Sequence, residues 1–108
     1  EGCSPGFLGV AIGGDRGTSY TASKEVLLRD LEDENTDEDL KHLETRITKE
    51  ANQMGIGPMG FGGNATVLGT KITSTHRLPA SFFVTISYMC WAYRRRKMIL
   101  ADNKVTYE

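Results

Sequence analysis

The residues of this chain best suited to chemistry are two cysteines far apart in the sequence, Cys3 and Cys90. A cysteine pair admits three interpretations: buried thiols without a partner, a disulfide, or two ligands of a metal centre whose other ligands lie elsewhere. For a cytosolic chain, taken by itself, buried thiols come first and a disulfide last, because reducing conditions keep thiols reduced.

Between the cysteines lies a glycine-rich stretch, residues 54–66, with five glycines in the nine positions that start at Gly55. Each glycine costs roughly 0.5–1 kcal/mol relative to alanine in a helix or strand, so the stretch predicts a loop. The spelling Gly55-x-Gly57-x-x-Gly60 matches a dinucleotide fingerprint, but that fingerprint follows a strand and opens a helix. Here it follows a predicted helix and contains Pro58. Two interpretations remain. The stretch is either a stiffened loop whose amides approach a cluster or a carboxylate, or a purely structural connection.

Two further polar features are His76 and the basic run from Arg94 to Lys97. A histidine can bind a carboxylate or pass a proton near pH 7, and the alternative is a turn histidine without function. Clustered bases can contact nucleic acid. Because the run is short and the net charge is -1, a solvated or subunit-facing turn is favoured. A site role for one arginine, Arg94, comes second and nucleic acid last.

Charge is distributed unevenly along the chain. Residues 1–54 hold twelve acids and six bases, whereas residues 55–108 hold two acids and seven bases, so an anionic ligand would be drawn to the second half. Seven of the ten residues from Asp30 to Asp39 are acidic. A calcium loop would need a central glycine there, which is absent, so this segment is predicted to be a solvated turn.

Each cysteine is predicted to stand at one end of a buried strand. The apolar run Phe7–Ile12 suits a strand buried on both faces, and Cys3 enters it through a turn stiffened by Pro5. The strongest strand pattern, residues 81–89, ends at Cys90. If the two strands are neighbours in one sheet, the cysteines and the glycine loop can converge.

The remaining elements are two helices, another strand and a hairpin. The first helix is predicted to start at Thr21 or Ser23, and the second to be capped by Thr36 and closed by Gly55. Residues 66–74 are predicted to form a strand. The apolar stripes are Val26, Leu27, Leu28 and Leu31 in the first helix, and Leu40, Leu43, Ile47, Ala51 and Met54 in the second. His42 lies off the stripe and is predicted to be a surface residue. A closing hairpin is predicted to pair 98–100 with 105–107 across Asp102-Asn103.

Length and composition place the chain among ordinary globular proteins. It has 108 residues, of which 39% are hydrophobic and 25% charged, and no apolar run is long enough to span a membrane. No signal peptide opens the chain, so a cytoplasmic protein is the simplest interpretation. The pattern predicts an α/β fold with a mixed sheet of about three to five strands and two main helices. Because the first residue is Glu1, an excised fragment is expected.

Three motifs together resemble a known family: Cys3-Ser-Pro, the run Gly55-Ile-Gly-Pro-Met-Gly-Phe-Gly-Gly-Asn, and Cys90-Trp-Ala-Tyr-Arg-Arg. They resemble the alpha region of the iron-sulfur hydro-lyases, the class I fumarate hydratase and L-tartrate dehydratase family. The resemblance covers essentially the whole chain but only the later part of that alpha region. It implies that residues 1–108 are a single partial domain of a larger hydro-lyase.

By this resemblance, Cys3 and Cys90 correspond to the family's second and third cysteine ligands of a 4Fe–4S cluster, and a further cysteine ligand is expected outside this chain. His76 answers a catalytic histidine that meets substrate, although here it stands about two residues further from the last cysteine. Gly57, Gly60 and Arg94 are the candidate substrate-binding residues. The catalytic base belongs to a separate beta region.

The function that the resemblance implies is reversible dehydration of a 2-hydroxy dicarboxylate, either malate or tartrate. The partners it implies are the small dicarboxylate and a beta subunit or beta domain, in a dimeric assembly, with neither nucleic acid nor membrane. The 108 residues alone are predicted to be inactive. The alternative is a non-enzymatic module that binds a nucleotide or anion through the glycine loop.

Overall fold

β1 is the central strand of a three-stranded mixed sheet in this computed structural model, which describes residues 3–108. β2 pairs with one side of β1 in parallel, and β3 pairs with the other side antiparallel. In chain order the elements are β1 (Gly6–Gly14), α1 (Arg16–Glu25), α2 (Glu38–Gln53), β2 (Val67–Arg77), β3 (Val84–Met89), β4 (Met98–Ala101) and β5 (Lys104–Tyr107).

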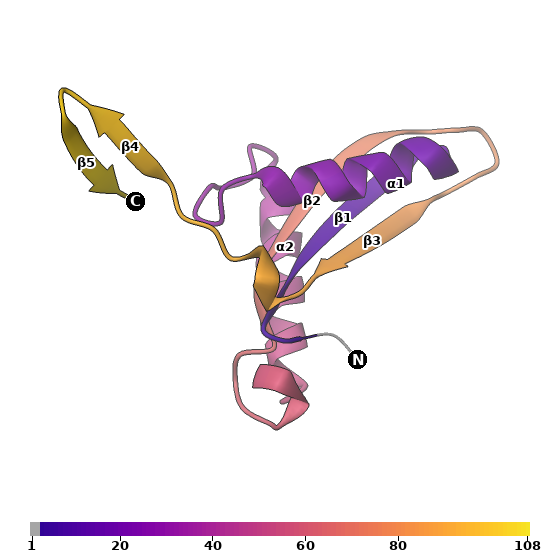
Figure 1. Ribbon diagram of the computed structural model, residues 1–108. Coiled ribbons are helices and arrows are strands. Elements are labelled where there is room, and N and C mark those ends of the chain that lie inside the picture. Colours follow the sequence, from indigo (N-terminus) through magenta and orange to yellow (C-terminus); the bar gives the residue numbers. More distant parts are fainter. Residues whose placement is uncertain (1–2) are drawn as a thin grey trace.

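The predicted fold class is confirmed. α1 lies in front of the sheet, α2 lies behind it, and the β4–β5 hairpin is held away from both (Figure 1). The buried apolar core is small and gathers around the central strand: Phe7, Val10, Ala11, Val26, Leu27, Val67 and Ile72. Within residues 3–108, no helix combines the length and the apolar character needed to cross a membrane.

The first helix begins earlier than predicted, at Arg16 and not at Thr21 or Ser23. Its cap is Asp15, whose carboxylate accepts the backbone N–H of Thr18 at 2.7 Å. This hydrogen bond lowers the pKa of the Asp15 carboxyl. Because the cap follows directly after β1, no loop separates the strand from the helix and marks the start of the helix in the sequence.

The side of α1 that faces the sheet is polar, which is why hydrophobic periodicity missed the start of this helix. Ser19 and Ser23 are almost fully buried, and their hydroxyls bond those of Thr85 and Ser87 at 2.8 and 2.7 Å. Opposite them, a Cβ on Gly9 would overlap the Ser23 carbonyl, so bare backbone lets α1 approach β1 closely. Hydroxyl pairs replace much of the apolar interface expected here.

Several residues predicted to be buried are exposed. Leu28 and Leu31, assigned to the stripe of the first helix, are 67% and 49% exposed, because that helix gives way to a short 3-10 turn at residues 26–28. β3 is an edge strand, and Val84 and Ile86 are 49% and 64% exposed. The prediction of a buried strand ending at Cys90 was therefore wrong in its burial, although the strand itself is present.

The second helix is close to its prediction at both ends but packs differently. Asp37, one residue after the predicted Thr36, caps it by accepting two backbone N–H groups, and Gly55 follows it with φ +66° as predicted. Its predicted apolar stripe is only half-buried, and Met54 is exposed. The buried face is centred on Glu44. His42 is exposed, as predicted.

Polar side chains of α2 form hydrogen bonds with backbone groups on the outer edge of β2. The amide of Asn52 donates to the Val67 carbonyl at 3.0 Å and accepts the Val67 N–H at 2.8 Å. Two turns earlier, the carboxylate of Glu44 accepts the N–H of Ile72 at 2.8 Å. The helix therefore takes the place of a neighbouring strand and covers an edge that would otherwise be open to pairing.

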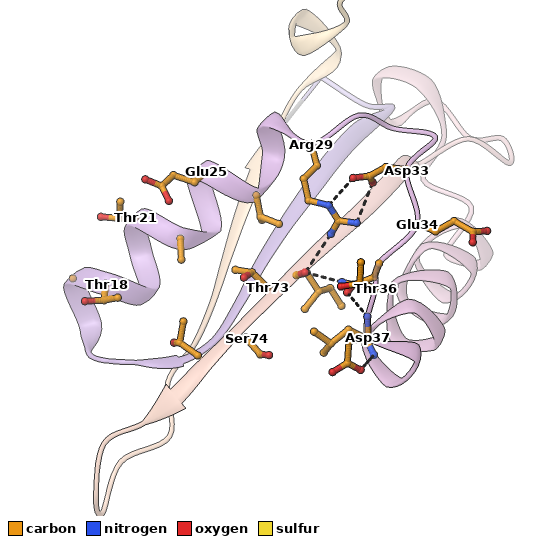
Figure 2. Close-up of a pocket in the computed structure, with 17 residues that line it drawn as sticks. Thr18, Thr21, Glu25, Arg29, Asp33, Glu34, Thr36, Asp37, Thr73 and Ser74 are labelled. Atoms are coloured by element: carbon orange, nitrogen blue, oxygen red, sulfur yellow. Dashed lines mark hydrogen bonds and ion pairs between the residues drawn. The ribbon is translucent and has the colours of Figure 1, made fainter.

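A charge network connects this edge to the acidic segment. Arg29 lies 2.8 Å from Glu44 and 2.9 Å from Asp33, and the buried Lys71 lies 2.7 Å from Asp33. Burial alone would raise the pKa of Asp33, but hydrogen bonds and charge from Arg29 and Lys71 outweigh it and the pKa is lowered. Figure 2 shows Arg29 and Asp33 facing one another beside a cleft that is lined by α1, the start of α2 and β2. The cleft has a volume of about 1070 Å³. The positive charges of Arg29 and Lys71 are therefore paired with the carboxylates of Asp33 and Glu44.

The predicted hairpin is confirmed. Met98 pairs with Tyr107 and Leu100 with Val105, and Asp102 and Asn103 turn the chain with φ of 50° and 58°. Positive φ at both central residues is what a tight two-residue hairpin turn requires.

Replacing Glu44 with alanine tests the edge role of α2. The variant leaves the buried Ile72 N–H without an acceptor and takes one carboxylate from Arg29, so we expect the unfolding free energy to fall by about 3 kcal/mol. Chemical denaturation measures this as a lower midpoint. The matched control is Glu50→Ala on the same helix, where Glu50 pairs with Arg46 at the surface and no change of midpoint is expected. Equal shifts in both variants would contradict the edge role.

Candidate metal centre

The two cysteines lie at the same end of the sheet. Cys3 precedes β1 and Cys90 follows β3, and the antiparallel register pairs Phe7 with Met89, so the start of one strand adjoins the end of the other. The backbone N–H of Trp91 donates to the Cys3 carbonyl at 2.9 Å and joins the two segments directly. Both thiols are free, with Cys3 exposed and Cys90 partly buried.

The glycine loop is fixed to the same end of the sheet by Ser4, the neighbour of Cys3. The buried Ser4 hydroxyl donates to the Gly57 carbonyl at 2.6 Å, and the Ser4 carbonyl accepts the Met59 N–H at 3.0 Å. Thr66, at the exit of the loop, accepts the Gly57 N–H through its hydroxyl at 3.1 Å. The structure therefore brings Cys3, Cys90 and the glycine loop together.

Gly57 and Gly60 occupy different environments within this loop. Gly57 is buried with φ +69°, and a Cβ there would overlap the carbonyl group of Gly62, so only glycine fits. Gly60 is exposed with φ +78° and open space around it. Their amides donate to Thr66 and to the Gly57 carbonyl, so both are already engaged within the loop. A ligand would meet other atoms of the loop than these two N–H groups.

Tyr88 closes one side of this end of the sheet. Its ring lies over Gly6, where a Cβ would overlap three atoms of the ring tip. Burial raises the pKa of Tyr88, and the negative charge available to Cys90 and then Cys3 raises it further.

The basic run divides into residues with different roles. Arg94 is exposed at the cysteine end and lies over the Trp91 ring, with its guanidinium carbon 5.5 Å from the ring centre. Arg95 instead donates to the carbonyls of Leu27, Leu28 and Arg29, the last at 2.6 Å, and so caps the turn after α1. The sequence singled out Arg94 but did not reveal the role of Arg95, because only the fold shows which arginine reaches a helix end.

His76 is not brought to the cysteines. It is an exposed residue near the end of β2, where Arg77 pairs with Gly14, whereas the cysteines flank the opposite end of β1. Nine residues of β1 separate the two ends, a span of roughly 30 Å at the usual rise per residue. His76 and the two thiols therefore cannot contact the same small ligand within this chain.

The donor set at the cysteine end suits a metal that prefers sulfur. Two free thiols at the same end of the sheet are the ligand type of iron-sulfur clusters and other thiophilic metals. Among residues 3–108 no group of three or more histidine, cysteine, aspartate or glutamate side chains could hold an ion. The two thiols fit part of a cluster site, and ligands from outside this set would have to complete it.

Comparison with known proteins identifies the family of this chain. The family model described as fumarate hydratase (Fumerase) matches residues 1–99. The chain belongs to the fumarate hydratase (Fumerase) family. The family predicted from the three motifs is thereby confirmed.

Two relatives illustrate the range of this fumarate hydratase family. A protein of Geobacillus stearothermophilus, whose name assigns it provisionally to the class I fumarate hydratases, is 55% identical over 103 residues. The alpha subunit of L(+)-tartrate dehydratase from Escherichia coli K12 is 34% identical over 106 residues. The matches cover 95% and 98% of this chain but only 20% and 35% of those proteins. The chain spans about a fifth to a third of the length of these relatives.

Replacing Ser4 with alanine tests the tie between the loop and the cysteine segment. Loss of the bond to Gly57 should cost about 1 kcal/mol locally, so amide exchange at Gly57 and Met59 should accelerate by roughly fivefold. Hydrogen exchange resolved by residue measures this. The matched control is Ser81→Ala at the opposite end of the sheet, where the exposed hydroxyl bonds the Leu78 carbonyl. Unchanged exchange in the Ser4 variant would contradict the tie.

Proposed function

We propose that Cys3 and Cys90 are two of the protein ligands of a 4Fe–4S cluster in a hydro-lyase that reversibly dehydrates a 2-hydroxy dicarboxylate, malate or tartrate. The observation that carries this proposal is the hydrogen bond between Trp91 and the Cys3 carbonyl, which holds the two cysteine segments together. Membership of the fumarate hydratase family supports the reaction class. The relatives' names, one a fumarate hydratase and one a tartrate dehydratase, leave both substrates in the proposal.

The chemistry explains why such a site is needed. Dehydration removes a weakly acidic proton next to a carboxylate and expels hydroxide. A bound cluster with one iron free of protein ligands supplies a Lewis acid for the carboxylate and hydroxyl oxygens. Two thiolates of this chain hold part of that cluster, and a third cysteine outside the chain is proposed to complete the protein ligands.

The surrounding residues are suited to an anionic substrate. Arg94 is exposed at the cysteine end, and we assign it to a substrate carboxylate. Gly57 and Gly60 give the loop a compact path beside Cys3 and so shape the wall that a substrate meets. The predicted role of His76 is left out of this proposal, because it lies at the other end of the sheet.

The partner proposed for this chain is a beta subunit or beta domain that brings the catalytic base. The Escherichia coli relative is named as a subunit alpha, which supports this division. The alternative of a nucleotide-binding module gains no support, since the glycine loop lies between α2 and β2 and opens no α-helix. A dimeric assembly and a cytoplasmic location stay predictions of the sequence.

Binding of Co²⁺ under anaerobic conditions tests whether the two thiols share one ion. Co²⁺ is the probe because its bonds to thiolate give a charge-transfer absorption in the near ultraviolet. We expect the 108-residue chain to show this band, and Cys3→Ser and Cys90→Ser each to weaken binding by at least tenfold. A serine at one position that leaves affinity and band unchanged would show that the thiols do not share a metal, and the proposal would fail.

The chain by itself should have no dehydratase activity. Loaded with ferrous iron and sulfide, it still lacks the third ligand and the base assigned to other parts of the enzyme. Formation of fumarate from malate, or of oxaloacetate from tartrate, should stay at the rate of a reaction without protein. Turnover above that rate, lost in Cys90→Ser, would show that the 108 residues contain the whole catalytic apparatus.

A further inference from the structure

Tyr88 is an unused polar group at the cysteine end. It stands on β3, two residues before Cys90, and is paired with Leu8 of β1. Its ring leans along the sheet toward the start of β1 and covers Gly6, with Cε2, Cζ and the hydroxyl oxygen where a Cβ would be. The ring tip therefore lies over a residue three positions after Cys3 and, by the pairing of Phe7 with Met89, next to the segment that leads into Cys90.

The hydroxyl makes no hydrogen bond to any residue that the structure describes. Tyr93 provides the contrast, because its hydroxyl donates to the Leu27 carbonyl at 2.9 Å. Tyr88 is 40% exposed, and its hydroxyl has no acceptor among residues 3–108. Its ring tip covers Gly6, and the pairing of Phe7 with Met89 places Gly6 next to the segment that carries Cys90. An unpaired donor at the same end of the sheet as two thiols is suited to an acceptor that is bound there.

Thiolate sulfurs are such acceptors. A phenol is protonated near pH 7 and donates one hydrogen bond, whereas a thiolate bound to a metal keeps lone pairs that accept. Hydrogen bonds to ligand sulfur tune the affinity and reduction potential of thiolate metal sites, and residues that supply them typically contribute 10- to 100-fold in metal affinity.

Resting on the proposed metal centre, we propose that Tyr88 is its positioning residue: its hydroxyl donates a hydrogen bond to a metal-bound thiolate of Cys3 or Cys90. Gly6 contributes to this arrangement, because only a residue without a side chain leaves room for the Tyr88 ring over β1. A residue with a Cβ at position 6 would push the ring away from the sulfurs. The pair thus accounts for a glycine at the first position of β1.

Tyr88→Phe tests this with Co²⁺ and without any activity measurement. Loss of the hydrogen bond raises the energy of the sulfur lone pairs, so the thiolate-to-cobalt band should move to longer wavelength and affinity should fall about tenfold. The control is Tyr20→Phe, an exposed tyrosine on α1, which should change neither. A Tyr88→Phe variant with the wild-type band and affinity overturns the proposal.

Gly6→Ala gives a second measurement. It should reproduce the band shift of Tyr88→Phe, and it should have little further effect when Tyr88 is already alanine, because the overlap no longer exists. Additive effects of the two substitutions would show that Gly6 acts independently of the ring, which overturns that part of the proposal.

The outcomes separate this proposal from the metal centre itself. If Cys3→Ser and Cys90→Ser lose the band while Tyr88→Phe keeps it unshifted, the metal centre stands and the role of Tyr88 fails. If the cysteine variants bind Co²⁺ as the wild type does, or the wild type binds none, the metal centre fails and the role of Tyr88 fails with it.

Discussion

The arrangement of this chain depends on β1 having one parallel and one antiparallel neighbour. The start of β1 must then adjoin the start of β2 and the end of β3. Cys3 precedes the first of these positions, the glycine loop precedes the second, and Cys90 follows the third. Backbone pairing alone therefore gathers three segments that are far apart in sequence, before any side chain contributes. The same pairing sends His76 to the opposite end.

Polar contacts hold both helices on this sheet, in addition to the small apolar core. Serine hydroxyls of α1 bond threonine and serine of β3, and Glu44 and Asn52 of α2 bond the edge of β2. Such contacts add little net stability when complete, but each is costly to break, because the partner left behind is buried and unpaired. Their directionality fixes register and orientation more narrowly than apolar packing of the same size would. The cysteine end is consequently held on a scaffold with few alternative packings.

The sequence predicted the elements whose patterns are local and failed where a tertiary partner decides. The hairpin across Asp102-Asn103, the cap at Gly55 and the strand of β1 follow from turn chemistry and apolar runs, and all are present. The start of α1 was missed, because the face of the helix that packs on the sheet carries serines whose hydrogen-bond partners lie on β3. At the candidate site, the motifs identified the cysteines and the loop. Ser4 and Tyr88 could not be found, because their significance depends on Gly57 and Gly6, which lie on other segments.

The cysteine end combines a fixed backbone with an accessible side chain. The Ser4 hydroxyl, the Ser4 carbonyl and the Cys3 carbonyl are all engaged with distant parts of the chain, while the Cys3 side chain stays exposed. A fixed backbone with an accessible thiol would lower the entropy lost on the proposed metal binding without blocking access to the sulfur. The apolar β4–β5 hairpin and the outer face of β3 are exposed in the same chain. Exposed apolar surfaces of this kind are typical of surfaces that contact further protein.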